Sequence, residues 1–301
     1  MQTATQPAKD LEGKACVVTG ATSGIGEVTA RVLAARGATV GLLCRDLEKG
    51  KRTQETIRSQ TGNDSVRVFR ADLASKAQIR TVAAEILEAF PRIHLLVNNA
   101  GVVNLRYSET EDGIETVFAV NHLGYFLLTQ LLLDRLRESA PARIVNVASH
   151  AHKFAKGIQF DDLGHREKYA SMRVYGHSKL ANILFTRELA RRLSGTGVTV
   201  NAVHPGAVAT GLGNNNGFWA RALTGALGIF FNSPEKGAAT TLFVATAPEL
   251  EGVTGRYYMR CREGSVSKAA EDDAAAARLW EVSEKMTSPD RAETADTRND
   301  T

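Results

Sequence analysis

Short apolar runs alternate with longer segments of mixed polarity along most of the chain. The runs are four to six residues long, and most are rich in Val, Ile and Leu. Between them, apolar residues recur at the three- and four-residue spacing of a helix that buries one face. Parallel strands that are covered on both faces and joined by crossover helices give this alternation. The pattern therefore predicts one α/β domain with a doubly wound parallel sheet. The expected strands are 15–19, 39–44, 65–69, 94–97, 143–147, 198–203 and 255–259, and the expected helices are 27–36, 47–59, 76–89, 111–138 (in one or two pieces), 172–193 and 234–246.

The two ends of the chain lack this alternation. Residues 1–13 are polar and contain no apolar stretch typical of a signal peptide, so we expect a flexible segment there. Residues 287–301 carry many charges and have Ala as their one apolar residue type, which predicts a disordered tail. The longest uncharged apolar run, 123–133, is shorter than a membrane-spanning helix. We therefore expect one folded domain over 14–286, no transmembrane segment and a cytoplasmic location, with peripheral membrane contact left open.

Composition and charge exclude several classes of protein. Of the 301 residues, 43% are hydrophobic, which is enough for a sizeable core. The net charge of +4 is not gathered into one block, so nucleic acid is not an expected partner. Three cysteines without a C-x-x-C pair do not predict a disulfide framework or a zinc site. The histidines lack metal-binding spacing, so we expect no metal and interpret four of them as solvated or pocket-lining: His150, His152, His165 and His177.

A glycine-rich turn, T-G-A-T-S-G-I-G over residues 19–26, follows the first expected strand and leads into the first helix. Glycines let the backbone turn sharply and let a pyrophosphate approach without a Cβ in the way. The helix that follows presents free N–H groups to the anion. The turn therefore predicts a dinucleotide-binding site. Its expected contact residues are Gly20, Ser23, Gly24, Ile25 and Gly26.

The spacing G-x-x-x-G-x-G in this turn resembles that of the short-chain dehydrogenase/reductase family. Further family motifs follow in the same order: N-N-A-G at 98–101, Ser149 at the end of the fifth strand, Y-x-x-x-K at 175–179 and Pro-Gly at 205–206. The resemblance covers about 14–286. It implies a Rossmann-type fold and an oxidoreductase that interconverts a carbonyl and an alcohol by hydride transfer with a nicotinamide cofactor.

Three further segments resemble the retinol-dehydrogenase-like branch of that family: F-D-D-L at 160–163, the stretch 175–193, and R-L-W-E-V-S-E-K at 278–285. The branch implies a hydrophobic aldehyde, ketone or alcohol of retinoid, lipid or aromatic type. Two departures stand out. Many members of the branch carry an N-terminal membrane anchor, which we do not expect here, and His94 occupies a place where the family usually has Asp.

The Y-x-x-x-K motif places Tyr175 and Lys179 one helical turn apart on the same face. A phenol has a pKa of about 10, and a nearby ammonium would lower it toward neutral pH. The resemblance then implies that Tyr175 supplies the proton and that Lys179 also holds the nicotinamide ribose. It implies that Ser149 donates a hydrogen bond to the substrate carbonyl oxygen. Asn121, within V-N-H-L-G, would position a water for proton relay to Lys179.

The end of the second strand bears on the choice of cofactor. An acidic residue there would bind the ribose 2′-hydroxyl and repel a 2′-phosphate, whereas Arg45 can pair with that phosphate. NADP(H) is therefore favoured over NAD(H). In the family, the Asp that matches Asp72, together with the backbone of the next residue, Leu73, recognises adenine. The other residues that the resemblance assigns to the cofactor are Asn99, Ala100, Gly101, Tyr175, Lys179, Pro205, Gly206, Val208 and Thr210.

Residues 211–231 are mostly apolar, and the family places its substrate lid in this region. Phe218, Trp219 and Leu223 recur near helical spacing and are the candidate lid residues. A helix that only covers the core, a subunit contact, or shallow membrane contact through the two aromatic residues would give the same pattern. Helices 111–138 and 172–193 form the common dimer surface in related folds, so a homo-oligomer is expected.

Two other functions fit much of the same sequence. One is a ketoreductase of secondary-metabolite biosynthesis, which the sequence does not separate from a carbonyl reductase or retinal reductase. The other is a non-catalytic protein that senses NADP. The presence of Ser149, Tyr175, Lys179 and Asn121 argues against the sensor, because a binding module needs no proton relay.

Overall fold

The computed structural model describes residues 9–206 and 233–289. Within these ranges, eight strands form one sheet in the order β3-β2-β1-β4-β5-β6-β7-β8, parallel except for β8 at one edge. The order reverses between β1 and β4, the switch point at which doubly wound sheets bind ligands. The predicted doubly wound α/β fold is therefore confirmed. The strands are β1 (Ala15–Thr19), β2 (Thr39–Cys44), β3 (Val66–Arg70), β4 (Leu95–Asn98), β5 (Ala142–Val147), β6 (Val198–His204), β7 (Tyr257–Met259) and β8 (Arg262–Glu263).

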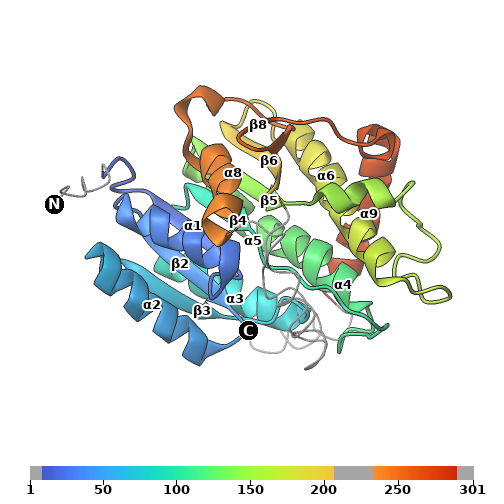
Figure 1. The fold of residues 1–301 in the computed structure, drawn as a ribbon, viewed down its shortest axis with the longest axis horizontal. Coiled ribbons are helices and arrows are strands. Elements are labelled where there is room, and N and C mark those ends of the chain that lie inside the picture. Colours follow the sequence, from blue (N-terminus) through green and yellow to red (C-terminus); the bar gives the residue numbers. More distant parts are fainter. Residues whose placement is uncertain (1–8, 207–232, 290–301) are drawn as a thin grey trace, which may run out of the picture.

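Helices cover both faces of the sheet (Figure 1). Neighbouring residues of one strand, such as Val17 and Val18, pack into two different buried clusters because successive side chains point to opposite faces. The first cluster includes residues of α3, α5, α6 and α9, and the second includes residues of α1, α2 and α8. The longer helices are α1 (Gly24–Ala35), α2 (Leu47–Thr61), α3 (Lys76–Ala89), α5 (Gly124–Glu138), α6 (Ser171–Arg192), α8 (Pro234–Thr246) and α9 (Asp273–Thr287).

The helix expected over 111–138 begins later than predicted. Gly113 has a φ of 70° in a turn, and Glu109 pairs with Glu115 in an isolated antiparallel bridge, so the chain is not helical before Thr116. The Glu115 carboxylate then accepts hydrogen bonds from the next N–H groups, at 2.9 Å from Val117 N and 2.7 Å from Phe118 N. The helix continues as the short α4 (Thr116–Phe118), a π-helical turn η1 (Ala119–Leu123) and α5.

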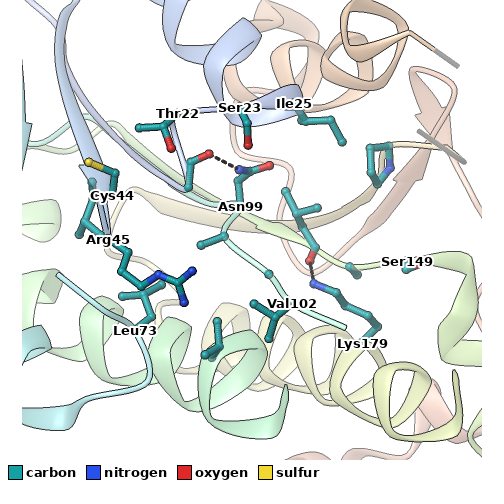
Figure 2. Close-up of a pocket in the computed structure, with 18 of the residues that line it drawn as sticks. Thr22, Ser23, Ile25, Cys44, Arg45, Leu73, Asn99, Val102, Ser149 and Lys179 are labelled. Atoms are coloured by element: carbon teal, nitrogen blue, oxygen red, sulfur yellow. Dashed lines mark hydrogen bonds between the residues drawn. The ribbon is translucent and has the colours of Figure 1, made fainter. Parts of the chain in front are cut away.

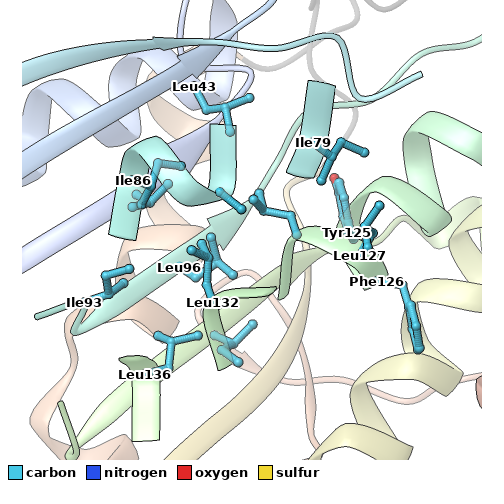
Figure 3. Close-up of a cluster of buried hydrophobic side chains, with 14 of the residues drawn as sticks. Leu43, Ile79, Ile86, Ile93, Leu96, Tyr125, Phe126, Leu127, Leu132 and Leu136 are labelled. Atoms are coloured by element: carbon cyan, nitrogen blue, oxygen red, sulfur yellow. The ribbon is translucent and has the colours of Figure 1, made fainter. Parts of the chain in front are cut away.

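The stretch Thr116–Glu138 is long and apolar enough to cross a membrane by length and composition. The expectation of no transmembrane segment rested on its uncharged run 123–133, which is shorter than a membrane-spanning helix. However, 78% of its most apolar window is buried inside the protein. In Figure 3, Tyr125, Phe126, Leu132 and Leu136 of this helix lie in the buried cluster beneath the sheet. Packing against the sheet therefore accounts for the apolar character of this helix.

The C-terminal part contains elements that the pattern did not predict. Helix α9 packs on α6, with Leu279 and Trp280 buried. The last strand ends at Met259 as expected but begins two residues late, at Tyr257, after Gly255 at a φ of 74°. A turn at Arg260 and Cys261, both at positive φ, then leads back into β8. Short 3₁₀ helices complete the described part of the fold: η2 (His150–Phe154), η5 (Pro248–Leu250) and η6 (Lys268–Glu271).

Candidate active site

A cavity of about 280 Å³ opens at the carboxyl ends of the strands, at the switch point of the sheet (Figure 2). Most of the predicted site residues line it, although they come from segments far apart in the sequence. Val208, Thr210, Phe218, Trp219 and Leu223 lie outside the described residues. The predicted residues that line the cavity are Gly20, Ser23, Ile25, Arg45, Asp72, Leu73, Asn99, Ala100, Gly101, Ser149, Tyr175, Lys179, Pro205 and Gly206.

The glycine-rich turn has a backbone that other residues would disturb. Gly20 and Gly24 have φ values of 65° and 56°, in the left-handed region that favours glycine. A Cβ on Gly26 would lie 2.3 Å from the Gly20 carbonyl oxygen and 2.4 Å from Asn99 Nδ2. The Ser23 side chain precedes α1 without making a capping hydrogen bond to it. The turn therefore keeps free the space and the donors that a pyrophosphate needs, and a dinucleotide fits this cradle.

The N-N-A-G segment is bonded to this turn. Thr19 Oγ1 accepts hydrogen bonds from Asn99 N at 2.8 Å and Ala100 N at 3.0 Å. In return, Asn99 Nδ2 donates to Thr19 O at 2.9 Å and lies 3.4 Å from Gly20 O, a link drawn in Figure 2. Beneath them, the Tyr125 hydroxyl donates to Ala100 O at 2.7 Å. These bonds fix the cavity wall to the buried core.

Arg45 and Asp72 face each other at one end of the cavity. Arg45 Nη1 lies 3.8 Å from Asp72 Oδ2, and the Arg45 side chain is 62% exposed. The other Asp72 oxygen accepts from Ala74 N at 2.9 Å. The neighbouring acid, Asp46, caps α2 by accepting from Lys49 N at 3.0 Å, and this bond lowers its pKa. The guanidinium is therefore available to an anion, whereas the Asp46 carboxylate is engaged by the helix.

Tyr175 and Lys179 project from α6 at the other end of the cavity. Lys179 is 2% exposed, and its Nζ donates to Val147 O at 2.8 Å (Figure 2). Burial lowers the pKa of Lys179 to about 7. Burial of the hydroxyl raises the pKa of Tyr175 to about 12, and a hydrogen bond from Ser149 opposes that rise. Desolvation therefore dominates the pKa of both groups, and the expected lowering of the phenol pKa by Lys179 stays a prediction.

Ser149 lies two residues after the end of β5 and is the N-cap of η2. Its Oγ accepts a hydrogen bond from Ala151 N at 3.1 Å. An accepting hydroxyl keeps its own hydrogen for donation, so the Ser149 O–H can donate into the cavity toward a substrate oxygen. The Ser149 hydroxyl is also close to that of Tyr175, because a hydrogen bond between them lowers the pKa of the phenol.

Asn121, Gly24 and Gly26 are predicted site residues that do not line the cavity. Asn121 lies fully buried in the π-helical turn η1. Its Oδ1 accepts from Val102 N at 2.8 Å, and its Nδ2 donates to Val102 O and Ser178 Oγ, each at 3.0 Å. The amide thus ties the loop after the N-N-A-G segment to α6 beside Lys179. Its role in positioning a water stays a prediction.

Sequence reasoning missed several lining residues that are neighbours of the motifs. Leu43 and Cys44 end β2, and Val147 and Ala148 lead into Ser149. Val120 carries no motif signal, and it lines the cavity from the π-helical turn η1. The remaining lining residues outside the predictions are Thr22, Ala71 and Val102.

The interpretation of the histidines needs correction. His152, His165 and His177 are 0%, 3% and 1% exposed, and none lines the cavity. Apolar packing explains part of this burial, since His177 lies beside Phe118 with ring centres 6.0 Å apart. Only His150 among the four is exposed, as predicted. Among the described residues, no group of three or more His, Cys, Asp or Glu side chains is arranged to hold a metal ion.

A second cavity, of about 570 Å³, lies at the amino ends of the central strands, and no predicted site residue lines it. Two of its polar side chains hold backbone groups. Arg143 donates to Val244 O and Ala247 O at the end of α8. His94 Nδ1 accepts from Ala15 N at 3.1 Å, so the residue that replaces the family's usual Asp joins β4 to the start of β1. The cavity at the carboxyl ends of the strands, which the predicted site residues line, is therefore the candidate active site.

The model of the short chain dehydrogenase family matches residues 14–220. Together with the cavity and its motifs, this match shows that the chain belongs to the short-chain dehydrogenase/reductase family of oxidoreductases. Within that family, it belongs to the retinol-dehydrogenase-like branch. Retinol dehydrogenase 12 of Mus musculus is 50% identical over 273 residues, which are 91% of this chain and 86% of the mouse protein.

Solved structures show the same fold. A crystal structure of an uncharacterized protein from Mycobacterium paratuberculosis has a TM-score of 0.73 and 34% identity, covering 94% of this chain and 96% of the other. A short-chain dehydrogenase from Burkholderia cenocepacia, solved in complex with NADP, has a TM-score of 0.65 and 30% identity. That alignment covers 82% of this chain and 96% of the Burkholderia chain.

Proposed function

We propose that this protein is an NADP(H)-dependent reductase and dehydrogenase that interconverts a hydrophobic aldehyde or ketone with its alcohol. One observation carries the proposal: Ser149, Tyr175 and Lys179 line the same cavity as the glycine-rich turn and Arg45. In Figure 2, Ser149 and Lys179 lie at one end, Arg45 lies at the other, and Ser23 of the turn lies between them. A cofactor bound by the turn along this cavity would bring its nicotinamide end to the three side chains. The family membership supports the carbonyl and alcohol chemistry.

The side chains supply the proton and the stabilising hydrogen bond. Ser149 donates to the carbonyl oxygen of the substrate, and Tyr175 gives its proton to the same oxygen as negative charge develops there. The nicotinamide, when bound, supplies the hydride that forms the new C–H bond at the carbonyl carbon. Lys179 is placed to hold the ribose hydroxyls. In the oxidation of an alcohol, Tyr175 takes the proton back.

The preference for NADP(H) is supported by the end of β2. Arg45 lines the cavity and its side chain is largely exposed, so its guanidinium can meet a 2′-phosphate. The Asp46 carboxylate, which could otherwise favour a 2′-hydroxyl, accepts a hydrogen bond from Lys49 N at the start of α2. The related Burkholderia cenocepacia enzyme was solved with NADP.

A retinoid-type substrate is supported by the names of the relatives, which are retinol dehydrogenases. Exposed apolar side chains lie near the catalytic residues in the sequence. Phe154 ends η2, which begins after Ser149, and Met172 precedes Tyr175 by three residues; these two side chains are 59% and 52% exposed. A hydrophobic substrate would cover such groups. The cytoplasmic location, the homo-oligomeric state and the apolar lid stay predictions.

Turnover of a panel of retinoid, aliphatic and aromatic aldehydes and of ketones, with NADPH and with NADH, tests the proposal. The expected result is NADPH oxidation with hydrophobic aldehydes, and a loss of at least a hundredfold in kcat for Tyr175→Phe with unchanged NADPH binding. Turnover of ketones alone would favour the biosynthetic ketoreductase. Binding of NADPH without turnover in either direction would instead point to a sensor and overturn the proposal.

A further inference from the structure

His152 joins the catalytic serine to a distant segment of the chain. It lies in η2, three residues after Ser149, and its side chain is 0% exposed. Its Nδ1 is 2.7 Å from Ser149 O, and its Nε2 accepts from Ser267 N at 3.1 Å. The Tyr257 ring packs against it with ring centres 5.4 Å apart at 67°. Both imidazole nitrogens are therefore used, each on the backbone of a different segment.

These two bonds allow one protonation state. A backbone N–H can only donate, so Nε2 must offer its lone pair to Ser267 N. A carbonyl oxygen can only accept, so Nδ1 must carry the hydrogen that bonds Ser149 O. The ring is therefore neutral, with its hydrogen on Nδ1. Burial lowers the pKa of His152, which is consistent with this state.

The bond to Ser149 O acts at the residue whose hydroxyl must point at the substrate. The same carbonyl accepts from His152 N at 3.1 Å, while Ser149 Oγ accepts from Ala151 N. Together these bonds fix both the peptide plane after Ser149 and the orientation of its hydroxyl. A misplacement of about 1 Å at a reacting group can cost about a hundredfold in rate.

We propose that His152 is a positioning residue for catalysis, which holds Ser149 in place through its Nδ1–H and is itself held by Ser267 N. The inference rests on the carbonyl and alcohol chemistry proposed above. It assigns the segment between β8 and η6 a role in the active site, although that segment does not line the cavity. Loss of the Nδ1 bond should act on kcat and on the ionisation of Tyr175, and leave the KM for NADPH nearly unchanged.

A matched pair of substitutions separates the two bonds. In His152→Asn, the side-chain amide stands as many bonds from Cα as Nδ1 does, so it can still donate to Ser149 O. In His152→Gln, the amide oxygen stands as far out as Nε2, so it can still accept from Ser267 N. Each variant keeps one of the two bonds, so similar losses of melting temperature are expected. His152→Phe keeps the ring shape and loses both bonds.

The expected result is a kcat within about threefold of wild type for His152→Asn and a loss of tenfold or more for His152→Gln and His152→Phe. A displaced Ser149 no longer lowers the pKa of Tyr175, so the pH at which alcohol oxidation rises should move upward in His152→Gln but not in His152→Asn. Equal kcat values in the Asn and Gln variants would overturn the inference, as would a fully active Phe variant. A wild-type protein without turnover would refute the proposed function itself.

Discussion

Arg45→Ala offers a direct test of cofactor choice. If the guanidinium pairs with the 2′-phosphate, the substitution removes a charge-assisted hydrogen bond worth about 1.5–3 kcal/mol. The Arg45 side chain is 62% exposed, so solvent screens the interaction and the lower end of that range applies. About 1.5 kcal/mol corresponds to roughly a tenfold loss of NADPH affinity. NADH has no phosphate at this position and should bind almost as before.

The assay is kcat/KM for NADPH and for NADH in wild type and variant, at two salt concentrations. Lys51→Ala is the matched control, because it removes one positive charge from an exposed position on α2 that does not line the cavity. The control should leave the ratio of the two cofactors unchanged. The expected loss for Arg45→Ala should shrink at high salt, since screening weakens exposed pairs. An equal loss with both cofactors would mean that Arg45 stacks on the adenine ring or stabilises the fold, and would refute its pairing with the 2′-phosphate.

Three further substitutions test other parts of the site. Lys179→Met should raise the free energy of unfolding, most strongly below about pH 7. Folding lowers the pKa of this lysine to about 7, so its buried charge destabilises the native state at low pH, and that cost disappears as pH rises toward 10.5. Denaturant unfolding across pH measures this gain in stability, and a gain that does not depend on pH would contradict the prediction. Gly26→Ala should cost about 1–3 kcal/mol of stability and weaken NADPH binding, because its Cβ would overlap Gly20 O. The control is Gly157→Ala, whose Cβ would have no atom within 4 Å and which should change neither property. Thermal melts and NADPH titrations compare the two variants. Ser267→Pro removes the N–H that holds His152 and should lower kcat about tenfold, while Ser267→Ala keeps that N–H and should not; equal kcat values in steady-state assays would argue against a role for this bond.

Local patterns were enough to predict those elements that have apolar periodicity and clear ends. The bounds of α3 and α8 agree with the prediction, and both helices begin after a serine whose Oγ accepts a backbone N–H of the first turn. The start of the long helix before α5 was wrong because Gly113 turns the chain where polar residues still suggested a helix. Helix α9 was missed, although Asp272 caps it in the same way.

The order of motifs predicted which residues meet at the cavity, because the carboxyl ends of parallel strands lie along one edge of a sheet. It could not predict contacts made across the fold by residues outside the motifs. The bond from Ser267 N to His152 joins positions 115 residues apart, and no spacing in the sequence indicates it. Val120 likewise lines the cavity from a π-helical turn, which the sequence did not reveal.

Protonation at the catalytic pair depends on the fold rather than on the motif. The four-residue spacing puts Tyr175 and Lys179 on one face of α6 and suggests an ammonium that stabilises a phenolate. In the folded chain, Lys179 Nζ instead bonds Val147 O, and burial favours the neutral form of both groups: the pKa of the lysine falls to about 7 and that of the tyrosine rises to about 12. The proton therefore stays on Tyr175 at neutral pH, which is the form that reduction of a carbonyl needs. Oxidation of an alcohol needs the phenolate, so oxidation should gain more than reduction as the pH rises. Desolvation depends on what packs around a side chain, so the Y-x-x-x-K pattern alone could not give the direction of these pKa shifts.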